Sequence, residues 1–177
     1  SMGKFVITAT QMLESMIENA TPTRAEVSDI ANAIYDGTDA IMLSAETSTG
    51  KYPVEAAGMM DRIAAETEAN LRYRGYQELP PMANPSHAEI IADAAYRAGR
   101  YRGVTALAVF TASGSTARLI SRFRPPVPIY AFTPFEEAAQ QLSIIYGVTA
   151  IVVPNAGSTD EMLLQMDREL QRRGYIK

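Results

Sequence analysis

Apolar runs and helical periods alternate along the first 71 residues of the chain. Residues 5–10 form a short, β-branched apolar run, which is typical of a strand buried in a parallel sheet. Thr23 and Glu26 have the spacing of a capping box, and apolar residues recur after them with a helical period. The predicted elements are a strand at 5–10, a helical turn at 11–18, a helix from 23 to 37, a strand at 39–43, a polar loop at 44–52 and a helix from 53 to about 71.

The same alternation returns after a change in composition. Residues 72–85 hold three prolines and one glycine and lose the helical period, which predicts a linker. Ser86 and Glu89 then form a second capping box, and Ser158 with Glu161 begins the last helix in the same way. The predicted elements are a helix from 86 to about 101, strands at 106–111, 129–132 and 150–153, a loop at 112–115, and helices ending near 123, 146 and 174.

This order of elements predicts an α/β fold in two parts. Strands that alternate with helices favour parallel sheets. The part before the linker supplies two predicted strands and the part after it supplies three. Two parallel strands can neither close a barrel nor cover both of their faces. We therefore expect the chain to be a portion of a larger protein.

Composition and charge narrow the class of protein. Apolar residues make up 47% of the chain and charged residues 20%, which allows a packed core and excludes wholesale disorder. The net charge of −4 gives no basic surface, so we expect neither nucleic-acid nor membrane binding. Cys is absent and His87 is the single histidine, which excludes disulfides, thiolate ligands and a His-rich metal site. No apolar run approaches the length of a membrane span, and we expect a cytoplasmic protein.

Two loops follow the first two predicted strands, at the end of a parallel sheet where ligands usually bind. In the first loop, Thr10 precedes a helical turn, so its hydroxyl can either bind an anionic substrate or cap that turn. In the second loop, Glu46 can be a base or a metal ligand, or it can be a solvated surface carboxylate. The residues alone leave both alternatives open.

A third loop, at residues 111–116, lies between a predicted strand and a predicted helix and has the sequence Thr-Ala-Ser-Gly-Ser-Thr. Four hydroxyl groups surround Gly114, and free backbone N–H groups at a helix N-terminus favour anions. The loop is either a phosphate-binding loop or an ordinary Ser/Thr-rich turn. It lacks the Gly-Lys-Ser/Thr of a Walker loop.

Long ordered runs of this sequence resemble the pyruvate kinase family. Residues 6–16, Val-Ile-Thr-Ala-Thr-Gln-Met-Leu-Glu-Ser-Met, resemble the segment of the family's seventh barrel strand. Residues 22–33 resemble the stretch that follows it, and residues 36–53 resemble the eighth strand and its loop. The resemblance continues through residues 111–124 and weakens after about residue 155.

The resemblance implies a fold and an activity. Residues 1–71 would be the last two βα units of a (β/α)8 barrel, residues 72–85 a linker, and residues 86–177 most of the C-terminal allosteric domain, with three α/β/α layers and a mostly parallel sheet. Members of the family transfer a phosphoryl group from phosphoenolpyruvate to ADP in glycolysis, giving pyruvate and ATP. They use Mg²⁺ and usually K⁺, and they are cytoplasmic tetramers.

The resemblance also implies roles for particular residues. Thr10 would be the barrel threonine beside the substrate, and Ser44 and Glu46 would line the rim of the same pocket. Arg24 would lie near the subunit interface next to that pocket. The residues that would bind the phosphate of a sugar-phosphate effector are Thr111, Ser113, Gly114, Ser115 and Thr116.

The departures from the family pattern limit what the chain alone is expected to do. Ala45 stands where the family usually has Gly. The first six barrel units are absent from the resemblance, and with them the acid pair that binds metal, the catalytic lysine, and the arginine and asparagine that bind phosphate and K⁺. Phosphoryl transfer depends on positioned cations, so we expect the isolated chain to bind neither Mg²⁺ nor K⁺ and to be inactive. The alternatives are a stand-alone sugar-phosphate-binding module and a region that mainly mediates assembly.

Overall fold

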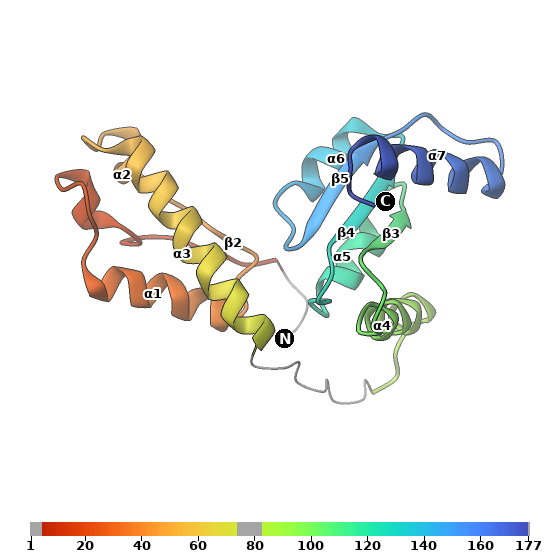
Figure 1. Cartoon of the computed structure of the whole chain (residues 1–177), viewed down its shortest axis with the longest axis horizontal. Coiled ribbons are helices and arrows are strands. Elements are labelled where there is room, and N and C mark those ends of the chain that lie inside the picture. Colours follow the sequence, from red (N-terminus) through yellow and green to blue (C-terminus); the bar gives the residue numbers. More distant parts are fainter. Residues whose placement is uncertain (1–4, 74–82, 177) are drawn as a thin grey trace. The chain divides into compact units, whose positions relative to one another are not determined.

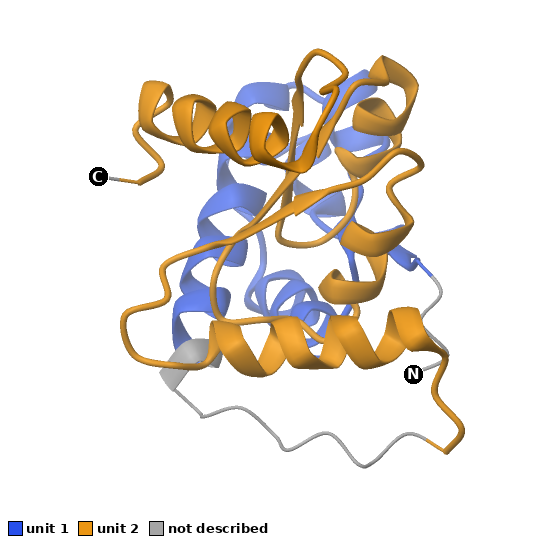
Figure 2. Ribbon diagram, turned by 90° about the vertical axis from the view of Figure 1, so that its right-hand side faces the viewer, with its two compact units in different colours: residues 1–78 blue, residues 79–177 orange. Residues whose placement is uncertain are grey.

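A computed structural model of the chain describes residues 5–73 and 83–176. It divides into two units, unit 1 at residues 1–78 and unit 2 at residues 79–177 (Figure 2). The division falls within the predicted linker, most of which lies outside the described residues, so the linker stays a prediction.

Unit 1 contains two βα units in sequence. Its elements are β1 (Ile7–Thr8), a 3-10 helix η1 (Glu14–Ile17), α1 (Arg24–Tyr35), β2 (Ala40–Ile41), α2 (Ala45–Ser48) and α3 (Pro53–Tyr73). The two strands are parallel, with Ile7 opposite Ala40 and Thr8 opposite Ile41. The predicted helices at 23–37 and from 53 are confirmed, and α1 begins with the predicted capping box of Thr23 and Glu26.

Five residue pairs of unit 1, including the two strand pairs, are separated by 33 positions in the sequence. The Val6 N–H donates to the Asp39 carboxylate, and Leu13 contacts Glu46 at the same separation. Glu18 and Lys51 form an exposed ion pair that also spans 33 positions. Each βα unit therefore contacts the equivalent positions of the next one.

The core of unit 1 lies between the 3-10 helix and the two long helices. α1 and α3 pack against each other because their apolar residues recur on one face. The buried residues are Met12, Leu13, Met16, Ile30, Ile34, Ala56, Met60 and Ile63.

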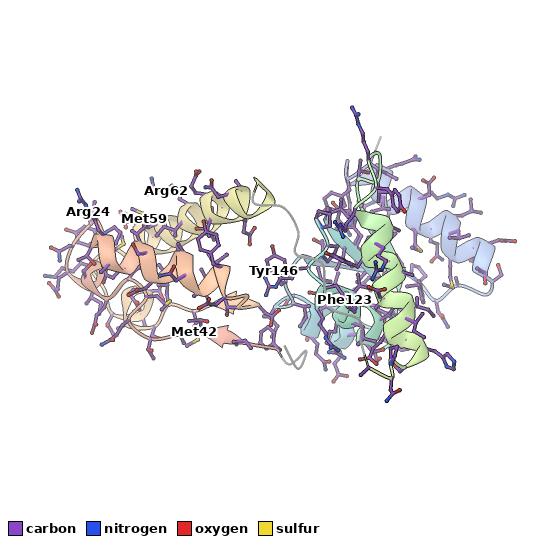
Figure 3. The ribbon with its side chains drawn as sticks, turned by 90° about the horizontal axis from the view of Figure 1, so that it is seen from below. Arg24, Met42, Met59, Arg62, Phe123 and Tyr146 are labelled. Carbon is purple, nitrogen blue, oxygen red and sulfur yellow. The ribbon has the colours of Figure 1, made fainter. Side chains whose placement is uncertain are left out.

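Two expectations for unit 1 were wrong in detail. The predicted strands at 5–10 and 39–43 are paired over only two residues each, Ile7–Thr8 with Ala40–Ile41. Val6 and Ile7 are about half exposed, as is Met42 beside β2 (Figure 3). The predicted polar loop at 44–52 contains the one-turn helix α2, which is too short to show a period in the sequence.

Unit 2 alternates strands and helices around a parallel sheet (Figure 1). Its elements are α4 (His87–Gly99), β3 (Leu107–Phe110), α5 (Ser115–Ser121), β4 (Ile129–Thr133), α6 (Glu136–Leu142), β5 (Val148–Val152) and α7 (Thr159–Arg172). The strand order is β3-β4-β5, and both pairings are parallel. β5 begins two residues before the predicted strand at 150–153.

The three layers of unit 2 follow from the alternation of residues along β4. All five residues of this central strand are buried. Ile129 and Ala131 face apolar residues of α4, α5 and α6, whereas Tyr130 and Phe132 face Met166 of α7. Helices thus cover both faces, and the α/β/α fold class with a parallel sheet is confirmed. No helix among the described ranges has the length and apolar character that crossing a bilayer needs.

Candidate functional site

The loops after β1 and β2 lie at the same end of unit 1, because the two strands are parallel. The first turns of α1 and α3 lie at this end as well (Figure 1). The backbone N–H of Lys51, just before α3, donates to the Ile17 carbonyl at the end of η1 over 2.8 Å. The segment that carries Thr10 and the segment that carries Ser44 and Glu46 are therefore brought together.

Glu46 joins the two loops through its carboxylate. Its Oε1 accepts the backbone N–H of Leu13 over 3.1 Å, and its Oε2 accepts the backbone N–H of Ser44 over 2.8 Å. The side chain is only 4% exposed, so the alternative of a solvated surface carboxylate is wrong. Both of its oxygens receive backbone donors, which leaves Glu46 suited to fixing the loops in place.

The ionisation of Glu46 follows from these contacts. Burial acts to raise the pKa of its carboxyl, since a charged group loses its hydration. Its own backbone N–H and those of Ser44 and Leu13 outweigh burial, and the nearby Glu26 carboxylate opposes them. The net pKa of Glu46 is below the ordinary value of 4.5, so the group is a carboxylate at neutral pH.

A second carboxylate, that of Glu26, contacts the loop after β1, although its spacing in the sequence indicates only a capping role. Its Oε1 accepts the Ser15 backbone N–H over 2.7 Å, and its Oε2 accepts the Ser15 hydroxyl over 2.6 Å. Burial raises the pKa of Glu26, but the Ser15 and Thr23 donors outweigh it and the net pKa is lowered. The capping-box spacing predicts the contact to Thr23, whereas nothing in the sequence indicates the contact to Ser15.

The Thr10 loop has an unusual backbone. Thr10 and Gln11 both have positive φ, 75° and 53°, although neither is glycine. Such left-handed conformations are sterically costly and persist where the surroundings enforce them, often at binding sites. The helix that follows begins at Glu14, with Leu13 at its N-cap position. The alternative in which Thr10 caps this helix is therefore wrong, and its side chain is exposed at the end of β1.

Arg24 is the first residue of α1 and is exposed (Figure 3). Its position at the same end of unit 1 as the Thr10 loop follows from the contact between Glu26, two residues later, and Ser15. The capping box fixes this first turn, because Thr23 accepts the Glu26 N–H and Glu26 accepts the Thr23 N–H. Arg24 therefore lies in the helical turn that is bonded to the loop after β1, and it is exposed.

The side chains of this site do not fit a metal ion. Mg²⁺ binds carboxylate and carbonyl oxygens in near-octahedral geometry. The oxygens of Glu26 and Glu46 already accept N–H and O–H donors. Within residues 5–73 and 83–176, no group of three or more acidic or His side chains is arranged to bind a metal.

The loop at residues 111–116, which is the candidate phosphate-binding loop, lies at the carboxyl end of β3. Thr111 is buried and its N–H donates to the Phe132 carbonyl, so it belongs to the edge of the sheet. Ser113 and Ser115 are exposed, and their hydroxyls are 3.2 Å apart. Thr116 is half-buried in the first turn of α5. Of the four hydroxyls, those of Ser113 and Ser115 are the most accessible to a ligand.

Gly114 permits the sharp turn into α5. Its φ is +78°, and a Cβ built on it would lie 3.1 Å from the Leu142 side chain. Arg118 of α5 donates to the Ser113 carbonyl over 2.8 Å, so it lies against the loop. Arg122, one turn later, pairs with Glu89 of α4 instead. The sequence left the directions of both arginines open, and the structure separates them.

Comparison with protein families matches both units. The model described as "Pyruvate kinase, barrel domain" matches residues 1–57, and "Pyruvate kinase, alpha/beta domain" matches residues 89–177. Their order along the chain is the order of unit 1 and unit 2.

Relatives with similar sequences are also named pyruvate kinase. The pyruvate kinase of Clostridium acetobutylicum is 44% identical over 179 residues, covering 100% of this chain and 38% of that protein. The pyruvate kinase of Sporosarcina psychrophila is 47% identical over 175 residues, covering 98% of this chain and 30% of that protein. The chain thus spans about a third of the length of these relatives.

Solved structures agree with the sequence matches. A crystal structure of a pyruvate kinase from Cryptosporidium parvum has a TM-score of 0.88 and 36% identity, and the match covers 99% of this chain and 36% of that one. A second crystal structure of pyruvate kinase from this organism has a TM-score of 0.85 and 35% identity. The two family matches and these likenesses show that the chain belongs to the pyruvate kinase family.

Proposed function

We propose that this chain is part of an enzyme that transfers a phosphoryl group from phosphoenolpyruvate to ADP, giving pyruvate and ATP. The observation that carries the proposal is the match of both units, in order, to the barrel and α/β domains of pyruvate kinase. The loops after β1 and β2 support it, because they meet at the strand ends where barrel enzymes bind substrates.

The proposed roles follow the placement of each residue. Thr10 is exposed at the end of β1, and its hydroxyl is a donor for the substrate beside it. Ser44 and Glu46 form the rim of the same pocket, where Glu46 orients the loops through its bonds to Leu13 and Ser44. Arg24 lies at the exposed start of α1, near the proposed subunit interface of a tetramer.

The isolated chain is expected to be inactive. Charge develops on the transferred phosphoryl group, and enzymes of this class offset it with metal ions and cationic side chains. In the proposed enzyme, Mg²⁺ and K⁺ are bound by other parts of the barrel, which also supply the catalytic lysine. The proposed location is the cytoplasm, where the reaction's nucleotide substrate is abundant.

A coupled assay for pyruvate tests the proposal. It is run on the whole enzyme of which this chain is proposed to be a part, and on residues 1–177 alone. Turnover by the former and none by the latter supports it. Thr10→Ala is expected to lower kcat/KM by about 10- to 100-fold, as for loss of a hydrogen-bond donor beside a reacting group. Thr21→Ala, at an exposed threonine outside the elements, is the control and is expected to change little. Absence of turnover by the whole protein would refute the proposal.

A second proposed function is binding of a sugar-phosphate effector by the 111–116 loop. The observation that favours it is that two exposed hydroxyls, those of Ser113 and Ser115, lie 3.2 Å apart, and that Arg118 of α5 donates to the Ser113 carbonyl of the same loop. Thr111 and Thr116 begin and end this loop, and Gly114 has the positive φ of its left-handed turn. Backbone N–H groups and a guanidinium together suit a phosphate group.

Calorimetry with fructose and ribose phosphates tests this second function. Binding that weakens at least tenfold in Ser113→Ala, but not in Ser143→Ala, supports the loop as the site. Ser143 is an exposed serine of unit 2 whose hydroxyl donates to the Gln140 carbonyl. No binding, together with a stable dimer or tetramer by light scattering, would instead favour a role of the α/β domain in assembly.

A further inference from the structure

The Glu26 carboxylate contacts more of the structure than a capping glutamate needs. In a capping box the N3 glutamate accepts the N-cap N–H, as Glu26 does from Thr23 over 2.7 Å. Glu26 also accepts both the N–H and the hydroxyl of Ser15, which lies 11 positions earlier in the chain. The first turn of α1 is therefore bonded to the loop that carries Thr10.

The other two capped helices show that this second contact is not part of the cap. Glu89 of α4 accepts from its cap residue Ser86 and pairs with Arg122, and Glu161 of α7 accepts the N–H of Gly157. The backbone N–H groups that these two carboxylates accept, those of Ser86 and Gly157, lie three and four positions away. Capping alone thus does not explain the Ser15 contact.

Glu26 acts on the loop together with Glu46. Glu46 accepts the N–H of Leu13 and Glu26 accepts that of Ser15, so two backbone donors on alternate residues of this segment are bound by carboxylates from two different later segments of the chain. Thr10 and Gln11, between β1 and these two donors, are both left-handed. A segment fixed at both ends can keep a backbone conformation that a free loop would leave.

We propose that Glu26 is a positioning residue for Thr10. Together with Glu46, Glu26 fixes the loop between β1 and η1 in its left-handed conformation. The proposal rests on the function proposed above, in which Thr10 lies beside the substrate. Glu26 touches no substrate in it. It acts through Ser15, and the carboxylate form is required because all of its contacts are accepted N–H or O–H donors.

Three variants of the protein as the cell makes it test the proposal. Glu26→Gln keeps the size of the side chain but turns an NH2 group toward N–H donors. Ser15→Ala removes one contact to Glu26 and leaves the capping box with Thr23 intact. Glu89→Gln is the matched control, because it weakens a capping box with the same Ser/Thr–Glu spacing in unit 2.

Two readouts separate positioning from general destabilisation. Hydrogen exchange of a peptide spanning residues 9–18 is expected to speed up about tenfold or more in Glu26→Gln, severalfold in Ser15→Ala, and not at all in Glu89→Gln. The kcat/KM for phosphoenolpyruvate is expected to fall about 10- to 100-fold in Glu26→Gln, as for a misplaced substrate-contacting group, and less than twofold in Glu89→Gln.

These measurements can refute the positioning role of Glu26 and the proposed phosphoryl-transfer function separately. Unchanged exchange at residues 9–18 in both Glu26→Gln and Ser15→Ala would overturn the positioning role, whatever the activity. Equal kinetic losses in Glu26→Gln and Glu89→Gln would overturn it as well. If the unsubstituted protein shows no turnover, the proposed function fails, while hydrogen exchange still decides whether Glu26 fixes the loop. If Glu26→Gln does not fold, Ser15→Ala gives the same decision.

Discussion

The backbone N–H of Leu13 donates to the Glu46 carboxylate over 3.1 Å, although 33 positions separate the two residues. Leu13 is fully buried and Glu46 nearly so, which means that water cannot replace either partner easily. This contact connects the loop after β1 with the loop after β2, and the proposed substrate pocket depends on that connection.

Removing this contact is expected to destabilise the protein. Glu46→Gln keeps one acceptor but places an NH2 group against a backbone N–H, at a cost of about 1–3 kcal/mol in the free energy of unfolding. Glu14→Gln, at an exposed glutamate of η1, is the control and is expected to change it by less than about 0.5 kcal/mol. Urea unfolding measures both, and equal stability of the two variants would contradict the role given to Glu46.

The two lowered carboxyl pKa values predict a loss of stability in acid. The pKa of Glu26 and of Glu46 in the folded protein lies below the ordinary value of 4.5, so the unfolded chain takes up protons first as the pH falls. Their stabilisation is complete above this ordinary pKa and disappears as the pH falls through the folded values.

Urea midpoints measured between pH 7 and pH 3 check this prediction. The midpoint of the unsubstituted protein is expected to fall more steeply below the ordinary carboxyl pKa than that of the double variant Glu26→Gln, Glu46→Gln. Other carboxyls with lowered pKa, such as Glu169 at about 2, contribute equally to both proteins and cancel in the comparison. Parallel curves would show that these two groups do not stabilise the fold through their charge.

Gly114 is expected to tolerate alanine less well than Gly147 does. Both have positive φ, +78° and +67°, so alanine at either position costs about 1–2 kcal/mol from the left-handed conformation. A Cβ on Gly147 meets nothing within 4 Å, whereas one on Gly114 lies 3.1 Å from the fully buried Leu142 side chain. Thermal unfolding should therefore give a lower Tm for Gly114→Ala, and a Gly147→Ala variant of equal or lower Tm would contradict this.

Phe132 and Phe135 provide a matched pair for the core of unit 2. Phe132 is fully buried in β4, and its truncation to alanine is expected to cost about 3–5 kcal/mol. Phe135, three positions later, is 55% exposed, and Phe135→Ala is expected to cost less than about 1 kcal/mol. Denaturant unfolding followed by circular dichroism measures both, and similar costs would show that α7 does not cover this face of the sheet.

Periodicity predicted the helices of this fold better than its strands. A helix leaves a repeat over many residues, and the capping boxes at Thr23 and Ser86 mark where α1 and α4 begin. Strand length depends on which residues find a partner, and an apolar run such as 5–10 does not contain that information. The one-turn helix α2 is too short to show a repeat, so its sequence predicts a loop.

The candidate site was predicted as a set of positions, but not as a geometry. A carboxylate in a polar loop suggests exposure, whereas Glu46 is buried because two backbone donors replace water around it. Glu26 could be assigned to a cap from its spacing, but its contact to Ser15 depends on how α1 packs beneath the loop. The left-handed backbone at Thr10 could not be predicted, because the residue there is not glycine.

The constant spacing between the two βα units restricts where natural variants can differ in length. Val6 with Asp39, Leu13 with Glu46 and Glu18 with Lys51 are all matched at 33 positions. An insertion inside either matched stretch shifts every later pair by one residue and turns side chains to the wrong face. An insertion at the exposed turn after α1, near Asp36, leaves all three pairs aligned. Indels among relatives should therefore cluster at that turn.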